Sequence, residues 1–515
     1  MSGANSDGLG GIAAEHLAAL SHELRTPLNG VIGMARLLEG TPLTAEQRDY
    51  VAALTQSGEH LLNLVNDVLD YARLGTGRVE LTPSVIDIEN LLRSVCELLS
   101  PRAHEKGLEI GWAAGLGLAP ILADQGRLRQ ILLNFVGNAV KFVDRGGVLL
   151  TADPLDGGRV RFTVADTGPG VPEAERERIF EAFSQMDPAA GGSLGGAGLG
   201  LAIARRIAGA MGGAAGVQVG EFGGAAFWFE AVFPVAGPAQ ESAPLKGFTV
   251  VVASPSAVVR AAAERQVEAS GGRVRSASGV AEALSACGPE AVLLVDRALS
   301  RPGAPLRAPP GRAAVILLRP EERSRIRGYR QAGFAGYLIK PLRPSSLVAR
   351  VLAATGAAPG PDFLNDDRVK SARTPAETAD AAPGARVLLV EDNAVNALLA
   401  STLLRREGCR VDHARDGAAA LAALAESRYD LVLMDVRMPV MDGLAATAAL
   451  RGRGLTVPVV ALTANDFDDD RRACDAAGMN DILAKPLAAD ALREVLARWA
   501  GSGWTDKPTR AKLTA

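Results

Sequence analysis

The sequence predicts a multidomain protein: a helical hairpin that forms a dimeric four-helix bundle, an α+β domain, and two doubly wound α/β domains. Its length of 515 residues exceeds what one hydrophobic core usually organises. Leucines near the N-terminus recur at three- and four-residue spacing, which predicts amphipathic helices. In the C-terminal half, apolar strands separated by alanine-rich helices occur in two successive sets, which is typical of two parallel sheets.

Composition and charge limit the class of protein. Hydrophobic residues make up 48% of the chain, and 55 basic against 58 acidic residues give a formal net charge of −3. Because no long basic block occurs, a nucleic-acid partner is not expected. No uninterrupted apolar run of about 18 residues predicts a membrane span. The four cysteines lack metal-binding spacing and the N-terminus lacks a signal-peptide pattern, so we expect a cytoplasmic protein in a reducing compartment.

The N-terminal hairpin is expected over residues 9–75. A Thr-Pro-Leu turn separates two sets of apolar residues at helical spacing, the first being Leu17, Leu20, Leu24 and Leu28. A hairpin alone cannot bury its apolar stripe, so we expect it to pair with a second copy in a homodimer.

The stretch LSHELRTPLNGVIG (residues 20–33) holds the chemistry of the hairpin. A neutral imidazole such as His22 is a nucleophile near pH 7, and the adjacent Glu23 can accept its proton. Pro27 lacks an N–H, which predicts a helix kink just beyond His22. A lone helical histidine is usually an ordinary polar residue, but this string resembles the phosphoacceptor box of histidine kinases. The resemblance implies that His22 is autophosphorylated, that Glu23 is the base, and that Thr26 positions water for hydrolysis of a receiver's phospho-aspartate.

The next domain, residues 84–236, should then bind ATP. Asn134, Asn138 and Lys141 share one helix face, and amide oxygens suit Mg²⁺ whereas a lysine suits phosphate. In DTGPG, Asp166 follows a strand and can accept a hydrogen bond from an exocyclic amine. In GGAGLGLAI, glycines precede a helix start, where free N–H groups favour phosphate.

Each of these motifs alone is more often a turn than a site. In this order they resemble the N, G1, F and G2 boxes of the GHKL-type ATP domain, with IFEAFSQMD as the F box. The resemblance implies that Asn138 holds Mg²⁺, that Asp166 reads the adenine, and that loop glycines shape the site: Gly168, Gly170, Gly196, Gly198 and Gly200. Ala197 stands where many members have Thr or Ser, which removes a hydroxyl contact to phosphate. Chaperones and topoisomerases share this fold, so the hairpin is what indicates a kinase.

In the last domain, residues 385–501, acidic residues gather at strand ends. Glu391 and Asp392 close the first strand, and Asp435 closes LVLMD. The carboxyl ends of parallel strands form one crevice, and three carboxylates there repel one another unless a cation such as Mg²⁺ is bound. Thr463 and Lys485 close two further strands and can hold a phosphoryl group on Asp435.

This pattern, with the loop DVRMPVMDG, resembles a response-regulator receiver. The resemblance implies transfer of the phosphoryl group from His22 to Asp435 and then to a downstream histidine phosphotransfer protein. Ile482 occupies a position where many receivers have a switch Tyr or Phe, so the usual aromatic readout is not expected in this domain.

The first repeat, residues 245–356, retains Asp296 and Lys340 as counterparts of the receiver's aspartate and lysine. From the correspondence of TVVVASP with VLLVEDN, Ala253 and Ser254 are predicted to replace the acid pair, and a leucine replaces the threonine. Without the pair, Mg²⁺ affinity should collapse, and a leftover buried ion pair is the simplest interpretation of the two retained residues. We therefore expect a pseudo-receiver, which acts as a spacer, a docking surface or a ligand sensor.

Two features favour a ligand sensor. Tyr337 keeps the aromatic switch position, and residues 319–343 are dense in arginine, whose guanidinium binds phosphate and guanine. A solvated helix face explains most of these arginines equally well. The domain order resembles soluble bacterial hybrid kinases whose pseudo-receiver binds cyclic di-GMP. That resemblance implies a ligand site at Tyr337, Ile339, Pro341 and Arg343.

In the same group, a linker element Asp-Asp-Arg docks back and holds the inactive form. Here the linker, residues 357–384, supplies LNDDRVK, and residues 502–515 are expected to form a tail. The leading hypothesis is a hybrid sensor histidine kinase of a phosphorelay, controlled by ligand binding to the pseudo-receiver. Two alternatives remain open: a net phosphatase of the relay that uses Glu23 and Thr26, and a non-catalytic nucleotide-binding scaffold.

Overall fold

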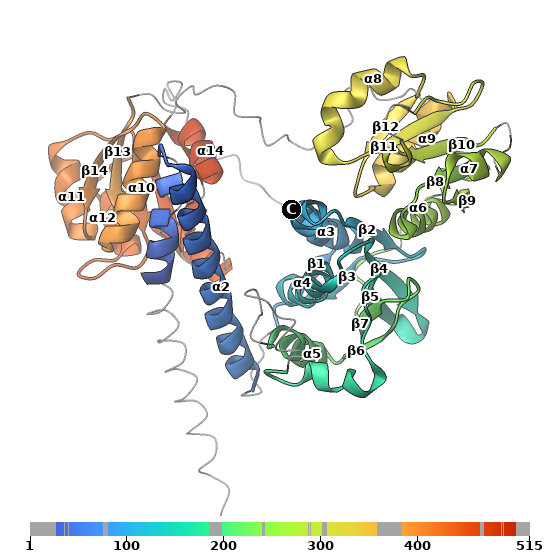
Figure 1. Cartoon of the computed structure of the whole chain (residues 1–515). Coiled ribbons are helices and arrows are strands. Elements are labelled where there is room, and N and C mark those ends of the chain that lie inside the picture. The colour runs from blue at the N-terminus through green and yellow to red at the C-terminus, as the bar shows by residue number, and fades with distance from the viewer. Residues whose placement is uncertain are drawn as a thin grey trace, which may run out of the picture. The chain divides into compact units, whose positions relative to one another are not determined.

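The computed structural model describes most of the chain (Figure 1). The described residues are 27–35, 37–39, 41–75, 81–184, 198–238, 243–286, 288, 290–300, 306–357, 384–463, 468–485, 487 and 489–500. They form two compact units, one within residues 66–371 and the other within residues 19–65 and 372–515. No helix in these residues is long and apolar enough to cross a membrane.

The described part of the hairpin confirms the predicted helices. Residues 27–35 are helical, and α2 extends over Ala45–Gly75. Thr44 and Gln47 form a reciprocal cap: each side-chain oxygen accepts a hydrogen bond from the other residue's N–H, at 3.2 and 3.0 Å, which fixes where α2 begins. Gly58 lets the two helices approach closely, since a Cβ there would lie 2.7 Å from Ile32.

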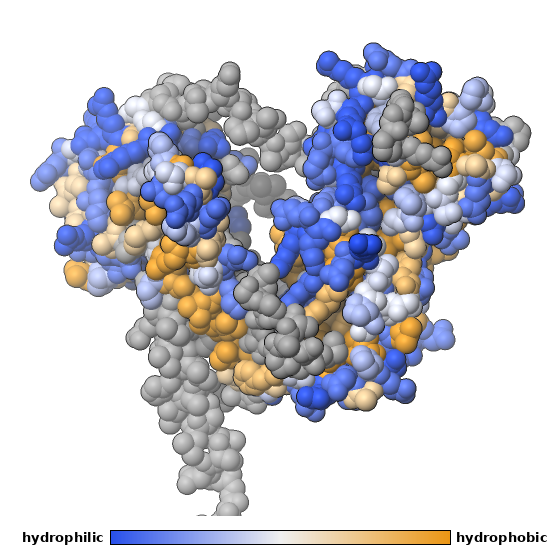
Figure 2. All heavy atoms as spheres, in the orientation of Figure 1, coloured by the Kyte–Doolittle hydropathy of each residue, from blue (hydrophilic) through white to orange (hydrophobic). Residues whose placement is uncertain are grey.

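Apolar side chains remain exposed along these helices (Figure 2). The exposed set includes Val31, Met34, Leu38, Leu54 and Leu61. An unpaired apolar stripe of this kind is what a hairpin leaves when its partner in a four-helix bundle is a second chain.

The α+β domain has one mixed sheet covered by three helices. The sheet order is β2-β4-β5-β7-β6, in which only the β2–β4 pair is parallel. In that order, the strands are Glu109–Ala114, Gly147–Leu155, Arg159–Asp166, Ala225–Val232 and Ala214–Val219. The helices are α3 (Ile88–Glu105), α4 (Gln125–Phe142) and α5 (Gly200–Ala210). A small antiparallel pair, β1 (Ser84–Ile86) and β3 (Ile121–Ala123), and 3₁₀ turns at 156–158, 173–175 and 178–180 complete it.

Aspartates define the starts of two of these helices, and large apolar side chains fill the space beneath them. Asp87 caps α3 and Asp124 caps α4, each through a side-chain oxygen that accepts a backbone N–H three residues on. Phe135, Phe162 and Phe229 are fully buried in the core that joins the helices to the sheet. This layer holds the ends of α4, β5 and α5 in fixed positions, and these ends carry the predicted nucleotide residues.

The first repeat is a five-stranded parallel sheet with the order β12-β11-β10-β8-β9. Its strands, in chain order from β8, are Thr249–Ala253, Arg273–Ala277, Val292–Asp296, Ala314–Leu318 and Gly336–Ile339. The helices α6 to α9 are Ala257–Ala269, Val280–Ala286, Ile326–Gln331 and Pro344–Ala354, with 3₁₀ turns at 297–299 and 320–325.

The second repeat has the equivalent order β14-β13-β15-β16-β17. Its strands, in chain order from β13, are Arg386–Val390, Arg410–Ala414, Leu431–Asp435, Val459–Thr463 and Asp481–Ala484. The helices α10 to α14 are Ala394–Arg406, Gly417–Glu426, Gly443–Gly452, Asp468–Ala477 and Ala489–Trp499. The two sheets confirm the predicted internal repeat and the fold class.

One residue correspondence between the repeats was wrong by one position. The N–H of Ser254 donates to Ala277 O at 3.1 Å, just as the N–H of Glu391 donates to Ala414 O at 3.1 Å. Ser254 therefore corresponds to Glu391, and the proline after it corresponds to Asp392, whereas Ala253 is the last strand residue. The apolar run in β8 has no polar residue inside it to mark the register, so the sequence alone left the alignment free to slip.

Candidate functional sites

Helix α4 carries three of the residues predicted to bind nucleotide. Asn134, Asn138 and Lys141 are half-buried along this helix. The side-chain amide of Asn134 donates to the carbonyl oxygen of Gly200 at 2.9 Å, which ties α4 to the first residue of α5. Burial lowers the pKa of Lys141, and a neighbouring arginine adds to the shift. The structure thus brings the predicted Asn-Asn-Lys set and the start of α5 together.

Asp166 lies at the end of β5 and is 5% exposed. Its Oδ1 accepts hydrogen bonds from the backbone N–H of Gly168 at 2.8 Å and of Ala225 at 3.1 Å. Both donors bind Oδ1, so Oδ2 is available as a hydrogen-bond acceptor, as the predicted role toward an exocyclic amine requires. Burial raises the pKa of the Asp166 carboxyl, while the two backbone hydrogen bonds act in the opposite direction.

Several glycines of this domain occupy positions where a side chain would be strained or would not fit. Gly170 and Gly198 have φ values of 74° and 69°, which L side chains rarely adopt. A Cβ at Gly224 would overlap the Asp166 carboxylate and the backbone nitrogen of Gly168. Gly224 was missed by the sequence reasoning, because the turn before β7 has no recognisable nucleotide motif. Gly196, and the departure at Ala197, lie outside the described residues.

The phosphoacceptor residues His22, Glu23 and Thr26, and the kink predicted beyond His22, also lie outside the described residues. The helix that follows them packs against the second repeat within the same unit. A Cβ at Gly33 would lie 3.0 Å from Leu399 of α10, and an Nη2 of Arg406 donates to the carbonyl oxygen of Leu37 at 3.2 Å.

The acidic strand ends of the second repeat meet as predicted. Glu391, Asp392 and Asp435 place one carboxylate oxygen each within 4.8 Å of the others. Lys485 Nζ donates to Glu391 Oε2 and to Asp435 Oδ2, both at 2.6 Å. Thr463 is buried at the end of the neighbouring strand β16. Three convergent carboxylates are the donor set of a hard divalent cation, so these residues fit Mg²⁺.

Burial raises the pKa of the Glu391 carboxyl, and the Lys485 ammonium opposes that shift. The side-chain amide of Asn396 donates to Glu391 Oε1 at 2.9 Å and holds this carboxylate from its other side. Asn396 was not among the predicted residues. Its position five residues after the acid, on the first turn of α10, is the signal that could have identified it.

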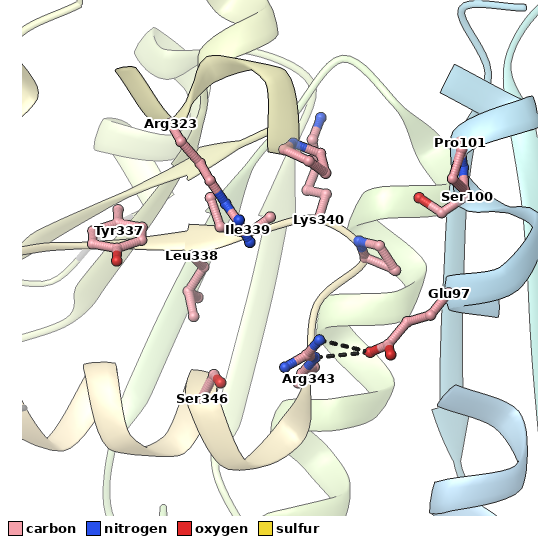
Figure 3. Close-up of a pocket in the computed structure, with 12 residues that line it drawn as sticks. Glu97, Ser100, Pro101, Arg323, Tyr337, Leu338, Ile339, Lys340, Arg343 and Ser346 are labelled. Carbon is pink, nitrogen blue, oxygen red and sulfur yellow. Dashed lines mark hydrogen bonds and ion pairs between the residues drawn. The ribbon is translucent and has the colours of Figure 1, made fainter. Parts of the chain in front are cut away.

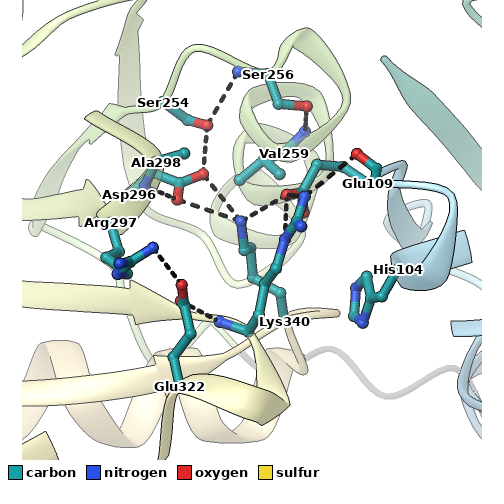
Figure 4. A network of polar contacts seen from close by, with 12 residues as sticks. His104, Glu109, Ser254, Ser256, Val259, Asp296, Arg297, Ala298, Glu322 and Lys340 are labelled. Carbon is teal, nitrogen blue, oxygen red and sulfur yellow. Dashed lines mark hydrogen bonds and ion pairs between the residues drawn. The ribbon is translucent and has the colours of Figure 1, made fainter. Parts of the chain in front are cut away.

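The first repeat keeps a related but incomplete set (Figure 4). Asp296 is 1% exposed and Lys340 is 3% exposed. Lys340 Nζ lies 3.2 Å from both carboxylate oxygens of Asp296, and the hydroxyl of Ser254 donates to Asp296 Oδ2 at 2.7 Å. The backbone N–H of Ala298 donates to Oδ1 at 3.0 Å. Asp296 is thus held by an ammonium, a hydroxyl and an amide, in place of the three-carboxylate set of the second repeat.

A carboxylate from the α+β domain enters this pocket, a contact that the sequence did not predict. Glu109 Oε1 accepts hydrogen bonds from Lys340 Nζ at 2.9 Å and from Nη2 and Nε of Arg319 at 2.6 and 3.0 Å (Figure 4). Glu109 is the first residue of β2 and lies 231 positions from Lys340. No local pattern in the sequence links the two residues.

The four predicted ligand residues of the first repeat line one cavity of about 240 Å³. Tyr337, Ile339, Pro341 and Arg343 belong to β12 and the loop after it (Figure 3). The opposite wall comes from α3 of the α+β domain, where Glu97 pairs with Arg343 at 2.8 Å. The linker residues Asp366, Asp367 and Arg368 lie outside the described residues.

Comparison with known families matches three segments of the chain. Residues 13–77 match the His Kinase A (phospho-acceptor) domain. Residues 123–255 match the histidine kinase-, DNA gyrase B-, and HSP90-like ATPase family. Residues 387–497 match the response regulator receiver domain.

The chain is also similar to individual proteins. It is 57% identical to full-length ShkA, crystallised in complex with AMPPNP, over 94% of this chain and 99% of that one, with a TM-score of 0.63. The Rec1 domain of ShkA, crystallised in complex with c-di-GMP, is 55% identical over 22% of this chain and 96% of that one, with a TM-score of 0.22. The sensor protein GacS of Pseudomonas syringae pv. syringae is 33% identical over 95% of this chain and 56% of GacS. The chain thus spans about half the length of the curated relatives it matches.

The steric role of Gly224 yields a first prediction. Gly224→Ala should lower the affinity for a non-hydrolysable ATP analogue by about tenfold, because the new methyl group must displace the Asp166 carboxylate. Calorimetric titration measures this affinity. Gly209→Ala is the matched control: Gly209 lies in α5 with open space around it, so its affinity should equal that of the wild type. Equal affinities for all three proteins would contradict the assignment.

The raised pKa of Asp166 yields a second prediction, on pH. If the ionised Asp166 carboxylate accepts a hydrogen bond from adenine, as predicted, the affinity for the nucleotide should be lost as pH falls through this pKa, which lies above the ordinary value of 3.8. Titration of the ATP analogue between pH 8 and pH 4 measures the profile. Asp166→Asn should bind the ATP analogue weakly at every pH in this range and should lack this pH-dependent loss of affinity. Identical profiles for the two proteins would show that Asp166 does not accept from the ligand.

Proposed function

The chain belongs to the family of hybrid sensor histidine kinases, and we propose that it uses ATP and Mg²⁺ to phosphorylate His22 and then transfers the phosphoryl group to Asp435. The observation that carries this proposal is the presence of two clusters of predicted site residues in one chain. One is the nucleotide site around Asn138 and Asp166, and the other is the cluster of Glu391, Asp392, Asp435 and Lys485. The phospho-acceptor family match over residues 13–77, a range that includes His22, supports a phosphorylated histidine as the link between them.

In the first step, an imidazole nitrogen of His22 attacks the γ-phosphorus and the bond to the leaving ADP oxygen breaks. Glu23 accepts the ring proton, and Asn134, Asn138 and Lys141 hold the triphosphate on α4. Asn138 would hold Mg²⁺, which would supply positive charge to the phosphate oxygens.

In the second step, a carboxylate oxygen of Asp435 attacks the phosphorus on His22 and the P–N bond breaks. Lys485 already contacts Asp435 at 2.6 Å, so its ammonium is placed to stabilise negative charge on the transferred group. The hydroxyl of Thr463, at the end of β16, would donate a hydrogen bond to the same phosphoryl group. Glu391, Asp392 and Asp435 would hold Mg²⁺, whose charge offsets their mutual repulsion.

We place this chain in a phosphorelay as a homodimer. The exposed apolar stripe on the hairpin supplies the dimer surface. The phosphoryl group on Asp435 then passes to the histidine of a phosphotransfer protein. During dephosphorylation, Thr26 would position water against the phospho-aspartate.

The pseudo-receiver cavity supports control of this kinase by cyclic di-GMP. Arg343 offers a guanidinium for a phosphate or a guanine edge, and Tyr337, Ile339 and Pro341 offer apolar surface for a planar base. In the present state, Arg343 is paired with Glu97 of α3. A phosphate ligand must replace that carboxylate, so its binding acts directly on the contact between the pseudo-receiver and the ATP-binding domain.

The third prediction concerns phosphoryl flow. With radiolabelled ATP, the wild type should incorporate label and His22→Ala should incorporate none. Asp435→Ala should retain label on histidine, because the aspartate that accepts the phosphoryl group is missing. Acid- and base-stability of the label distinguishes phosphohistidine from phospho-aspartate. Label that persists in His22→Ala would contradict the assignment. Absence of label in every protein, with and without ligands, would favour the non-catalytic scaffold. Rapid removal of label from a phosphorylated partner protein would favour the phosphatase.

The fourth prediction concerns the ligand. Calorimetric titration of the full chain with cyclic di-GMP should give binding in the micromolar range or tighter, and Arg343→Ala should weaken it by about tenfold or more through loss of charge-assisted hydrogen bonds. Arg327→Ala, which removes an exposed arginine of α8 outside the cavity, is the matched control and should bind as the wild type does. No heat at tens of micromolar ligand would contradict this control mechanism.

A further inference from the structure

The last strand of each α/β sheet is followed by a lysine that contacts two carboxylates. In the receiver, both carboxylates are local: Lys485 pairs with Glu391 and Asp435 at 2.6 Å each. In the pseudo-receiver, Ser254 stands at the position of Glu391, so one carboxylate is missing from the domain itself. Lys340 nevertheless has two, because Glu109 of the ATP-binding domain joins Asp296.

Glu109 is placed for this contact by its position at the start of β2 and is 6% exposed. Its Oε1 collects three donors, one from Lys340 and two from Arg319, the residue that follows β11. Arg319 also donates to the carbonyl oxygen of Gly107, two residues before the glutamate, at 3.3 Å. Two cations of the pseudo-receiver therefore converge on one short segment of the ATP-binding domain.

We propose that the former phosphoacceptor pocket of the pseudo-receiver is a docking socket for Glu109, and that Glu109, Lys340, Arg319 and Asp296 form a carboxylate latch between the two domains. In this latch, Glu109 takes the place of the carboxylate that Ser254 does not provide. The pocket has lost its own acid pair and with it the Mg²⁺-dependent chemistry, and it now binds a carboxylate of another domain.

Further contacts join the pseudo-receiver to the ATP-binding domain beside the latch. Helix α6 packs on β2 and β4, where Ala262 lies against Gly111: a Cβ on that glycine would be 2.9 Å from the alanine. Gln266 donates to the carbonyl oxygen of Trp112 at 2.8 Å, and Arg265 pairs with Asp153 at 2.9 Å. The apolar part is small, consisting of Leu149, Val258 and Ala262 with two half-buried neighbours.

The charges of the latch make docking specific. Removal of Glu109 leaves Lys340 with one carboxylate and leaves Arg319 without its side-chain acceptor in a half-buried site, which is strongly unfavourable in the docked state. In the undocked state, water solvates the same groups, and Lys340 keeps Asp296. A change at Glu109 therefore acts mainly on the docked state and shifts the equilibrium toward separation of the domains.

The latch also adjoins the ligand cavity. Lys340 lines that cavity together with Arg343, and each of these cations is paired with a carboxylate of the ATP-binding domain, Glu109 and Glu97 respectively. An anionic ligand in the cavity competes with both carboxylates for these cations. This coupling rests on the proposed ligand control, whereas the latch itself does not.

Hydrogen exchange of the full chain, without nucleotide or ligand, tests the latch. Glu109→Gln removes the charge with little change in shape, and Ser254→Glu restores a local carboxylate that competes for Lys340. Each variant should raise amide exchange at α6 (257–269) and β2 (109–114) by about tenfold or more. Glu105→Gln is the matched control: it removes an exposed acid from the end of α3 and should exchange as the wild type does.

Exchange at β5 (159–166) and β15 (431–435) reports on the folding of the ATP-binding and receiver domains and should stay at the wild-type level. If Glu109→Gln also loses protection at β5, Ser254→Glu decides, because it alters no residue of the ATP-binding domain. The latch would be overturned if Ser254→Glu showed wild-type exchange at α6 and β2. The same result in Glu109→Gln would overturn it if exchange at β5 stayed at the wild-type level.

A second measurement separates the latch from ligand control. If both the latch and ligand control hold, Glu109→Gln should bind cyclic di-GMP more tightly than the wild type. The gain in affinity should equal the increase in the population of the undocked state. Equal affinities would overturn the coupling between latch and cavity. Absence of binding in both proteins would overturn ligand control, while the exchange result would still decide whether the latch exists.

Discussion

A buried ammonium needs carboxylate partners, and much of this structure depends on how that requirement is met at the end of one strand. The lysine after the fifth strand of a parallel sheet is fixed by the fold on both sides of the linker, at Lys340 and Lys485. Lys340 is buried and Lys485 is half-buried, so both lysines are held largely by carboxylates. The identity of the second carboxylate therefore determines what each sheet does.

Where the second carboxylate is Glu391, the pocket stays within its own domain and has the donor set for Mg²⁺ and a phosphoryl group on Asp435. Where it is Glu109, the same pocket joins two domains. In our proposal, the serine and the proline that replace the acid pair account for the loss of Mg²⁺-dependent chemistry in the pseudo-receiver, and the serine accounts for its tie to the ATP-binding domain. The cavity lies beside this tie, so the proposed ligand site and the proposed latch share Lys340.

The sequence was informative where chemistry is encoded in contiguous residues. The strand-end acids, the Asn-Asn-Lys helix face and the loop around Asp166 were all found from local patterns, and the structure brings each set together. It was uninformative where a contact joins distant segments, as for Glu109 with Lys340 or for Gly224 with Asp166. The one-residue shift at Ser254 has a different cause: the apolar run at residues 250–253 of β8 gives no internal marker of register.

We propose that only one of the two aspartate pockets receives the phosphoryl group, because the other holds Glu109. Borohydride reduction of the ATP-treated wild type converts aspartyl phosphate to homoserine, and peptide mass spectrometry then locates it. The account predicts homoserine at position 435 and unmodified aspartate at position 296. Homoserine at position 296 would contradict it, since Asp296 would then be an active phosphoacceptor.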